Sequence, residues 1–214
     1  MTSTPDLSGC MQRVAAAGLS AGTSGNASSR TPLGMCITPS GVAPARLDAQ
    51  SGVHMRLDGT VIEGVLEPSS EWRMHAAIYA SHPEAGAIVH CHSRHATALA
   101  CCGMDIPAFH YMVAVAGGDS IRCAPYALFG SEELAAHAVK ALDGRRACLL
   151  GNHGQIATGK DLDAALSLAI EVEELAAQYL LALAAGTPRV LDAQEMQAVI
   201  ARFAGYGQSR RRDG

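Results

Sequence analysis

The sequence lacks any long hydrophobic run, any Cys-x-x-Cys motif and any strong excess of charge of one sign. Without a hydrophobic run of about 20 residues we expect no membrane-spanning helix, and the polar first residues, MTSTPD, predict no secretory leader. A formal net charge of −4 and a pI near 6.1 give no electrostatic footprint for nucleic acid. We therefore expect a cytoplasmic protein that binds neither a membrane nor a nucleic acid.

The seven cysteines form an odd set without metal-site spacing, which argues against a disulfide scaffold and against a thiolate zinc site. A chain of 214 residues, 49% of them hydrophobic, can bury a large core. The chain has no internal repeat and no linker-like segment. We therefore predict a single domain over residues 1–214, with flexible ends at 1–6 and 208–214.

The apolar stretch AIVHCHS, residues 87–93, is typical of a buried strand and ends in two histidines. Successive side chains of a strand point to opposite faces, so we expect His90 and His92 on one side and Cys91 on the other. Two imidazoles directed at one point can hold a metal ion. Polar residues paired on a strand surface are the alternative interpretation of an isolated His-x-His.

A third histidine and a carboxylate follow turns elsewhere in the chain. Residues 146–150, RACLL, predict a second buried strand, and His153 follows it within the sequence GNHG. Glu71 begins a predicted helix with Ser69 or Ser70 as its N-cap, although a carboxylate there also complements the helix dipole. Three imidazoles with one open position are typical of a catalytic zinc, a Lewis acid toward a carbonyl or enolate oxygen.

Two further turns, GTSGN (22–26) and ITPSG (37–41), combine glycines with hydroxyl side chains. Such turns can present backbone N–H groups to an anion, although an ordinary turn before a strand is the alternative. His75, one turn beyond Glu71, is equally compatible with a surface position. The other expected elements are a hairpin around 58–59, strand and loop over 106–126, and helices over 7–19, 94–102 with Ser93 as cap, 131–142 with Ser131 as cap, 161–184 and 192–204.

Eight motifs, in order, resemble the metal-dependent class II aldolases of the L-fuculose-1-phosphate aldolase type: GTSGN, ITPSG, PSSEW, VHCHS, IPAFHY, AGGDSI, CAPY and NHG. The resemblance extends from Gly18 to Gly207. L-Ribulose-5-phosphate 4-epimerase and the adducin head share the fold of these aldolases. The resemblance implies a single α/β domain with a mainly antiparallel central sheet flanked by helices. It also implies a homotetramer with active sites between subunits.

The resemblance further implies a zinc ion, or cobalt or manganese in its place, held by His90, His92 and His153. Glu71 would be the fourth ligand at rest and the acid and base once substrate displaces it. Tyr111 could otherwise be an aromatic side chain packed in the core. In the resemblance it matches the aldolases' tyrosine that reaches into a neighbouring subunit's site and handles the proton on the aldehyde-forming oxygen. The phosphate would be held by Thr23, Ser24, Gly25, Asn26, Ser40, Gly41, Ser69 and Ser70, and the aldehyde end by Phe129, Phe203 and Tyr206.

The implied reaction is reversible cleavage of a ketose 1-phosphate into dihydroxyacetone phosphate and an aldehyde. Fuculose 1-phosphate and the 5-deoxy and 5-methylthio derivatives of ribulose 1-phosphate all present the same reacting atoms. Epimerases usually carry Asp where this chain has Glu71 and His-Ala-Asp near Tyr111, which favours aldol cleavage. Methylthioribulose-1-phosphate dehydration and sugar-acid decarboxylation stay open, whereas a non-enzymatic adducin-like module would not need the complete set of four ligands.

Overall fold

The computed structural model describes residues 5–204 of the chain. Within this range one eight-stranded sheet has the order β4-β3-β2-β1-β5-β8-β7-β6. Every pairing of neighbouring strands is antiparallel except that of β6 with β7. The strands are β1 Asn26–Thr31, β2 Gly34–Ile37, β3 Val53–Met55, β4 Val61–Glu63, β5 Ala87–Cys91, β6 Cys123–Ala124, β7 Ala147–Leu150 and β8 Gly154–Gly159. The predicted mainly antiparallel α/β fold is confirmed.

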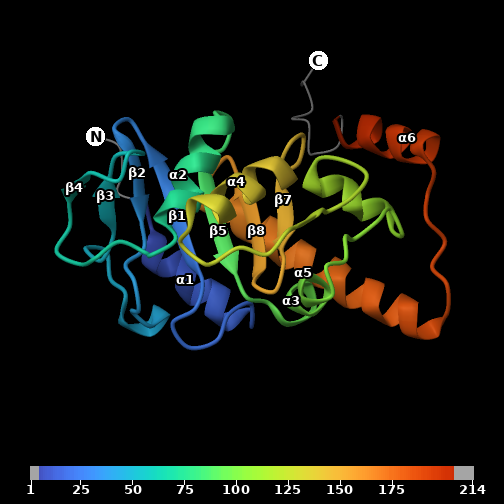
Figure 1. The fold of residues 1–214 in the computed structure, drawn as a ribbon, viewed down its shortest axis with the longest axis horizontal. Helices are drawn as coiled ribbons and strands as arrows, with labels where there is room; N and C mark the ends of the chain where they lie inside the picture. Colours follow the sequence, from blue (N-terminus) through green and yellow to red (C-terminus); the bar gives the residue numbers. More distant parts are fainter. Residues whose placement is uncertain (1–4, 205–214) are drawn as a thin grey trace, which may run out of the picture.

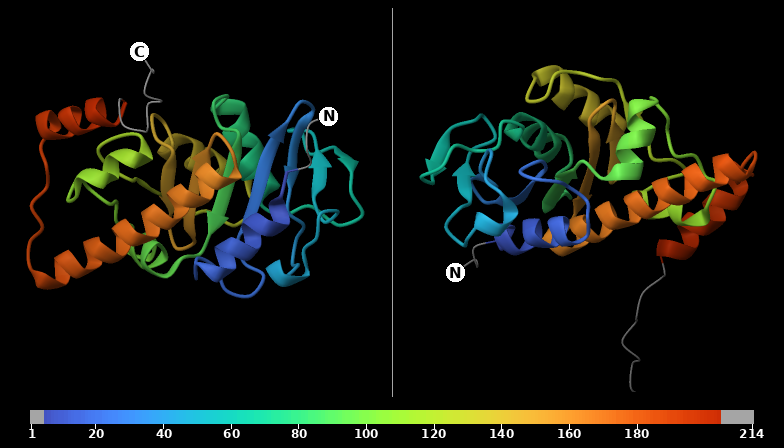
Figure 2. Two further views of the ribbon diagram at one scale, coloured as in Figure 1. Left: turned by 180° about the vertical axis from the view of Figure 1, so that it is seen from behind. Right: turned by 90° about the horizontal axis from the view of Figure 1, so that it is seen from below.

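Helices cover both faces of this sheet (Figure 1). They are α1 Leu7–Ala16, α2 Trp72–Ser81, α3 Arg94–Cys101, α4 Glu132–Ala141, α5 Leu162–Ala185 and α6 Ala193–Ala204, with short 3-10 helices η1 Pro44–Arg46 and η2 Tyr111–Ala116. Helices α1, α3 and α5 share one hydrophobic cluster, and α2 and α4 share the cluster on the other face. Figure 2 shows the long helix α5 crossing its face of the sheet beside α1. No helix among residues 5–204 is long and apolar enough to cross a membrane.

Strand β5 lies in the middle of the sheet and separates the two clusters. Its alternate residues Val89 and Cys91 pack with α1, α3 and α5, whereas Ile88 packs with α2 and α4. The side of Cys91 is therefore opposite to that of His90, as the alternation predicts. β5 pairs with β1 in a register that places Asn26 opposite His90, and with β8 in a register that places Cys91 opposite Gln155.

Several expected elements are present with small shifts of their ends. The hairpin around 58–59 is formed by β3 and β4, and Ser131 caps α4 by accepting a hydrogen bond from Leu134 N at 3.1 Å. α1 ends at Ala16 rather than Leu19. The segment 106–126, predicted as strand and loop, also contains the 3-10 helix η2, which packs against α6 far from β4 (Figure 1).

Two predicted helix caps are wrong in detail. Glu71, not Ser69 or Ser70, occupies the N-cap of α2. Ser69 belongs to the preceding turn, in which its backbone carbonyl oxygen accepts a hydrogen bond from Trp72 N at 3.0 Å. Ser93 occupies the N-cap of α3 without capping it, since its hydroxyl accepts from Gln155 Nε2 at 2.7 Å. The first free N–H groups of α3, those of His95 and Ala96, donate instead to the carboxylate of Glu173 on α5, which comes close only in the folded chain.

Candidate metal centre and active site

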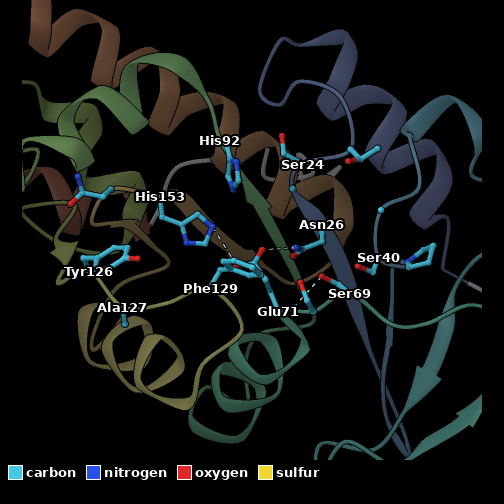
Figure 3. Close-up of a pocket in the computed structure, with 16 residues that line it drawn as sticks. Ser24, Asn26, Ser40, Ser69, Glu71, His92, Tyr126, Ala127, Phe129 and His153 are labelled. Atoms are coloured by element: carbon cyan, nitrogen blue, oxygen red, sulfur yellow. Dashed lines mark hydrogen bonds and ion pairs between the residues drawn. The ribbon is translucent and has the colours of Figure 1, made fainter.

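Three histidine rings meet at one end of the central strands. His90 lies in β5, His92 follows it, and His153 lies in the turn between β7 and β8. The ring centroids are 4.8 to 4.9 Å apart, and one ligand atom from each residue lies within 4.8 Å of the others. The antiparallel pairing of β5 with β8 brings the turn carrying His153 beside the end of β5. Figure 3 shows His92 and His153 directed toward Glu71.

Two glycines allow the backbone to approach this closely. A Cβ at Gly154 would lie 2.5 Å from the carbonyl oxygen of Cys91 and 3.0 Å from Cδ2 of His92. A Cβ at Gly25 would lie 2.8 Å from the carbonyl oxygen of His90, and Gly25 has φ +83°. Only glycine meets both demands without strain. The glycines therefore keep the starts of β1 and β8 close to His90 in β5 and to His92 just after it.

Glu71, at the start of α2, lies beside the three histidines. Its side chain is buried, and Oε2 accepts a hydrogen bond from Asn26 Nδ2 at 2.9 Å and lies 3.1 Å from His90 Nε2. Oε1 lies 3.3 Å from His153 Nε2 and has no hydrogen-bond partner among the described residues. A buried carboxylate oxygen without a donor is costly, so Oε1 is suited to coordinate a cation.

The second nitrogen of His90 defines how its ring faces the centre. Nδ1 lies 2.8 Å from the backbone carbonyl oxygen of Gln155, to which it donates, so Nε2 points at the other rings. Such a hydrogen bond fixes the tautomer and orientation of metal-binding histidines. Three imidazole nitrogens and one carboxylate oxygen are a donor set that zinc, cobalt or manganese accepts. The residues therefore fit a divalent cation.

Burial and mutual charge set the protonation states in the group. Burial, followed by the charge of His90, lowers the pKa of His92 and that of His153 to about 4. Burial raises the pKa of the Glu71 carboxyl, but His90, His153 and the Asn26 hydrogen bond outweigh it and hold the pKa well below its usual range. At neutral pH His92 and His153 are neutral and Glu71 is ionised, which are the forms that bind metals.

A pocket of about 370 Å³ opens beside the histidines. It is lined by Thr23, Ser24, Gly25, Asn26, Pro39, Ser40, Gly41, Ser69, Ser70, Glu71, His92, Tyr126, Ala127, Phe129, Asn152 and His153. All eight residues expected to hold a phosphate are among them, and Figure 3 shows Ser24, Asn26, Ser40 and Ser69 on the side of the pocket away from His153. The fold therefore brings the three hydroxyl-rich turns and the metal ligands to one pocket.

Hydrogen bonds between loops hold two of these turns together. Ser69 N donates to Thr38 O at 3.0 Å and Ser40 N donates to Glu67 O at 3.0 Å. Ser24 likewise donates its N–H to Ala21 O at 3.2 Å and its hydroxyl to the same oxygen at 2.7 Å. The turns are thus less open than the sequence suggests, since three of the expected N–H donors are already used. The hydroxyl groups of Thr23, Ser40 and Ser70 and the remaining N–H groups are left for an anion.

Residues 6–180 match the model of the family described as Class II Aldolase and Adducin N-terminal domain. This chain belongs to the class II aldolase and adducin family. Among its relatives, a 5-methylthioribulose-1-phosphate/5-deoxyribulose-1-phosphate aldolase of Rhodospirillum rubrum is 50% identical, with 92% of this chain and 89% of the relative aligned. The L-fuculose phosphate aldolase of Escherichia coli is 49% identical, with 89% of this chain and 88% of the relative aligned.

Solved structures of the family show the same fold. An L-fuculose 1-phosphate aldolase superposes with a TM-score of 0.90 at 41% identity, covering 93% of this chain and 94% of the other. The L-fuculose-1-phosphate aldolase of Thermus thermophilus superposes with a TM-score of 0.73 at 30% identity, covering 86% and 96%. The family resemblance read from the motifs is therefore confirmed, and with it the class II aldolase type of enzyme.

Not all predicted site residues of this family member reach the pocket of their own chain. Phe129 lines it, but Tyr111 does not; Tyr111 is 50% exposed on η2 and stacks on Phe203 of α6 with ring centroids 6.4 Å apart. Tyr206 lies outside the described residues. Tyr111 and Phe203 instead line a separate, mostly apolar pocket between η2 and α6.

Some pocket residues were missed by sequence reasoning. Tyr126 and Asn152 line the pocket, and Asn152 is the non-glycine residue with positive φ, at 53°, within residues 5–204. Asparagine tolerates this conformation, so the GNHG motif could have indicated a tight turn that directs His153. His75, considered for the surface, is fully buried behind Glu71.

Proposed function

We propose that this family member uses a divalent metal to cleave a ketose 1-phosphate reversibly between C3 and C4, giving dihydroxyacetone phosphate and an aldehyde. The observation that carries the proposal is the position of Glu71, whose unpaired Oε1 lies beside three converging histidines at a pocket rich in hydroxyl groups. A site built only for packing would not bury a carboxylate oxygen without a donor. The names of relatives at 49 to 50% identity support the same reaction.

His90, His92 and His153 are the proposed ligands of the metal, with Glu71 as the fourth ligand at rest. Zinc is the proposed ion, and cobalt or manganese suits the same donors. Once bound, the cation supplies positive charge beside the oxygens on which negative charge develops as the bond breaks. The hydrogen bond from His90 Nδ1 to Gln155 O keeps the ring in place for this role.

Two residues are proposed to move the protons. As the C3–C4 bond breaks, the proton leaves the C4 hydroxyl, C4 becomes the aldehyde carbon, and the bonding electrons pass to the C2–C3 unit. Tyr111 takes the proton from the C4 hydroxyl, and Glu71, which would take up a proton from water when substrate displaces it as a ligand, delivers that proton to C3; exchange with water then returns both residues to their starting states. Because Tyr111 is absent from the pocket of its own chain, it would act in a neighbouring subunit's site.

The phosphate end of the substrate is assigned to the hydroxyl-rich turns, at Thr23, Ser24, Gly25, Asn26, Ser40, Gly41, Ser69 and Ser70. Ser40, Ser70 and Thr23 are exposed at the pocket, so a phosphate can reach their hydroxyl groups without displacing buried structure. The aldehyde end is assigned to Phe129 of the same chain with Phe203 and Tyr206. Fuculose 1-phosphate and the 5-deoxy and 5-methylthio derivatives of ribulose 1-phosphate are the proposed substrates.

A cytoplasmic homotetramer with sites between subunits is the proposed assembly. Tyr126, Leu128 and Phe129 are 61 to 62% exposed in the isolated chain, next to the pocket. Tyr111, also exposed, lies on η2 and does not line the pocket of its own chain. Both observations support a site that is completed by a second copy of the chain.

Three rival reactions could use the same ligands: sugar-phosphate 4-epimerisation, methylthioribulose-1-phosphate dehydration and decarboxylation of a sugar acid. The discriminating experiment is a coupled assay for dihydroxyacetone phosphate release from the three proposed substrates, with and without a chelator. Release from at least one substrate, abolished by the chelator and restored by zinc, is the expected result. Failure to release it from any of them would favour dehydratase or decarboxylase chemistry.

A further inference from the structure

Behind Glu71, polar side chains of α2 and β1 alternate along the contact between the two elements. Glu71, His75 and Tyr79 are spaced four residues apart at the start and along one side of α2. Asn26 and Ser28 occupy alternate positions of β1 and therefore share one face of the sheet. None of the functions assigned above uses His75, Ser28 or Tyr79.

Hydrogen bonds join these five side chains into one continuous series, named here the α2–β1 chain. Asn26 Nδ2 donates to Glu71 Oε2 at 2.9 Å, and His75 Nε2 lies 2.6 Å from Asn26 Oδ1. Ser28 Oγ lies 2.7 Å from His75 Nδ1 and 2.8 Å from the hydroxyl of Tyr79. The series thus runs from Tyr79 to the proposed ligand and acid–base residue.

The chemistry of the groups fixes the direction of donation. The amide oxygen of Asn26 can only accept, so His75 donates from Nε2, and a neutral imidazole then accepts at Nδ1. Burial lowers the pKa of His75 to about 3, which keeps this ring neutral. Ser28 therefore donates to His75 and accepts from Tyr79, and every link points toward the carboxylate of Glu71.

Burial shows that the series is not a surface network. His75 and Ser28 are fully buried, Tyr79 is 1% exposed, and Asn26 is 4% exposed. Buried polar groups weaken a core unless each is satisfied, and apolar residues of similar size would pack this contact more simply. A polar series in such a place, satisfied at every atom except Glu71 Oε1, therefore has a use beyond packing.

The far end of the series is anchored. The guanidinium carbon of Arg30, two residues beyond Ser28 on β1, lies 4.6 Å from the centre of the Tyr79 ring. Arg30 also donates to the carbonyl oxygens of Tyr79 at 2.8 Å, Ala85 at 2.8 Å and His82 at 2.9 Å. The last turn of α2 is thereby tied to the strand that carries Asn26 and Ser28.

We propose that His75, Ser28 and Tyr79 are positioning residues that lock the Asn26 amide with its NH₂ group toward Glu71. The locked amide holds Oε2 and leaves Oε1 free for the cation and for proton transfer. Without the donor at His75, the Asn26 amide can rotate and present its oxygen to the carboxylate, which would repel it. This role rests on the proposed function of Glu71.

The test compares His75→Leu, which breaks the series, with His75→Gln, which keeps a donor near the position of Nε2. Ile78→Val is the matched control, because Ile78 is equally buried on α2 but packs in the apolar cluster. We expect His75→Leu to lower kcat at least tenfold with KM changed less than twofold. His75→Gln should recover most of kcat, and Ile78→Val should leave kcat unchanged.

A second readout does not depend on turnover. Binding of Co²⁺ to the metal-free protein should weaken about tenfold in His75→Leu, as expected when the outer hydrogen bond to a ligand, here from Asn26 to Glu71, is disturbed, and the visible absorption of bound cobalt should change. His75→Gln and Ile78→Val should match the wild type in both respects. If His75→Leu does not fold, Ser28→Ala and Tyr79→Phe serve in its place, with smaller effects of the same sign.

The outcomes separate the inference from the proposed function. The positioning role is overturned if the wild type is active and folded His75→Leu has unchanged kcat and cobalt binding. If His75→Leu does not fold, the same result in Ser28→Ala and Tyr79→Phe overturns it. A wild type that binds cobalt but releases no dihydroxyacetone phosphate overturns the proposed reaction. In that case a changed cobalt spectrum in His75→Leu would still support the positioning of Glu71.

Discussion

His90 Nε2 lies 3.0 Å from His92 Nε2. Two imidazole lone pairs cannot face each other at this distance unless a proton or a cation lies between them. Burial lowers the pKa of His90, but the charge and hydrogen bond of Glu71 together with the Gln155 carbonyl raise it overall, which favours a proton on this ring beside Glu71 and His92. A divalent cation can replace this proton.

Removal of the metal should therefore abolish turnover and lower stability. At a free metal concentration about 1,000 times Kd, bound cation stabilises the fold by ~4 kcal/mol. Thermal unfolding should shift downward in a chelator and return when zinc is added, and metal analysis should give one ion per chain. Full activity of protein shown to be metal-free would contradict the proposal.

Glu71→Gln should keep the shape of the site but remove the group that transfers protons. We expect kcat to fall by roughly 10²- to 10⁴-fold, the usual contribution of general acid–base catalysis. With metal in excess, the metal content of the same preparation should stay near that of the wild type, because three histidines remain, although the affinity falls with loss of the carboxylate. Normal turnover by this variant would show that Glu71 moves no proton.

Tyr111→Phe should slow cleavage more than it weakens substrate binding, because the lost hydroxyl acts on the leaving oxygen and not on the phosphate. A mainly KM effect would argue against this role. Mixing unfolded Tyr111→Phe and Glu71→Gln chains and refolding them together should restore part of the activity, since some sites of the hybrid would combine an intact Glu71 with a neighbour's intact Tyr111. Refolding each variant alone is the control, and absence of rescue would place Tyr111 outside the neighbouring site.

His75 should make the metal-free protein sensitive to acid. Its pKa is about 3 in the folded protein and 6.5 ordinarily, so the unfolded chain binds the proton more readily. This difference does not affect the free energy of unfolding above pH 6.5. As pH falls from 6.5 toward 3, proton uptake by the unfolded chain lowers that free energy by about 1.4 kcal/mol per pH unit. Urea unfolding in chelator should show that the free energy of unfolding falls between pH 7.5 and pH 5 by about 2 kcal/mol less in His75→Gln than in the wild type. Equal pH dependence of the two proteins would count against a buried neutral His75.

The metal ligands were predictable because local rules apply to them. Alternation along β5 separates His90 from Cys91, and the glycines around His153 indicate a turn at the end of a buried strand. The α2–β1 chain was not predictable, since it depends on how a helix lies across a strand some 45 residues earlier in the sequence. Burial of His75 follows from that packing and not from its own neighbours.

The same distinction explains the other differences. Ser69 has the chemistry of an N-cap, but its pairing with Thr38 draws it into a turn, and that contact is invisible from the local sequence. Tyr111 lies on a 3-10 helix because the glycine-broken segment packs against α6. The position of Tyr111 relative to a pocket depends on a second copy of the chain, which no pattern within one chain describes.

The register that places Asn26 opposite His90 has a consequence for how this protein can fail. A slip of one residue between β1 and β5 would turn the side chain of Asn26 to the opposite face of the sheet, and Ser28 with it. Most backbone hydrogen bonds of the sheet would survive such a slip, but Glu71 would lose its only donor from β1. Specific activity per folded chain is therefore a direct gauge of strand alignment, able to detect misaligned molecules that circular dichroism would count as native.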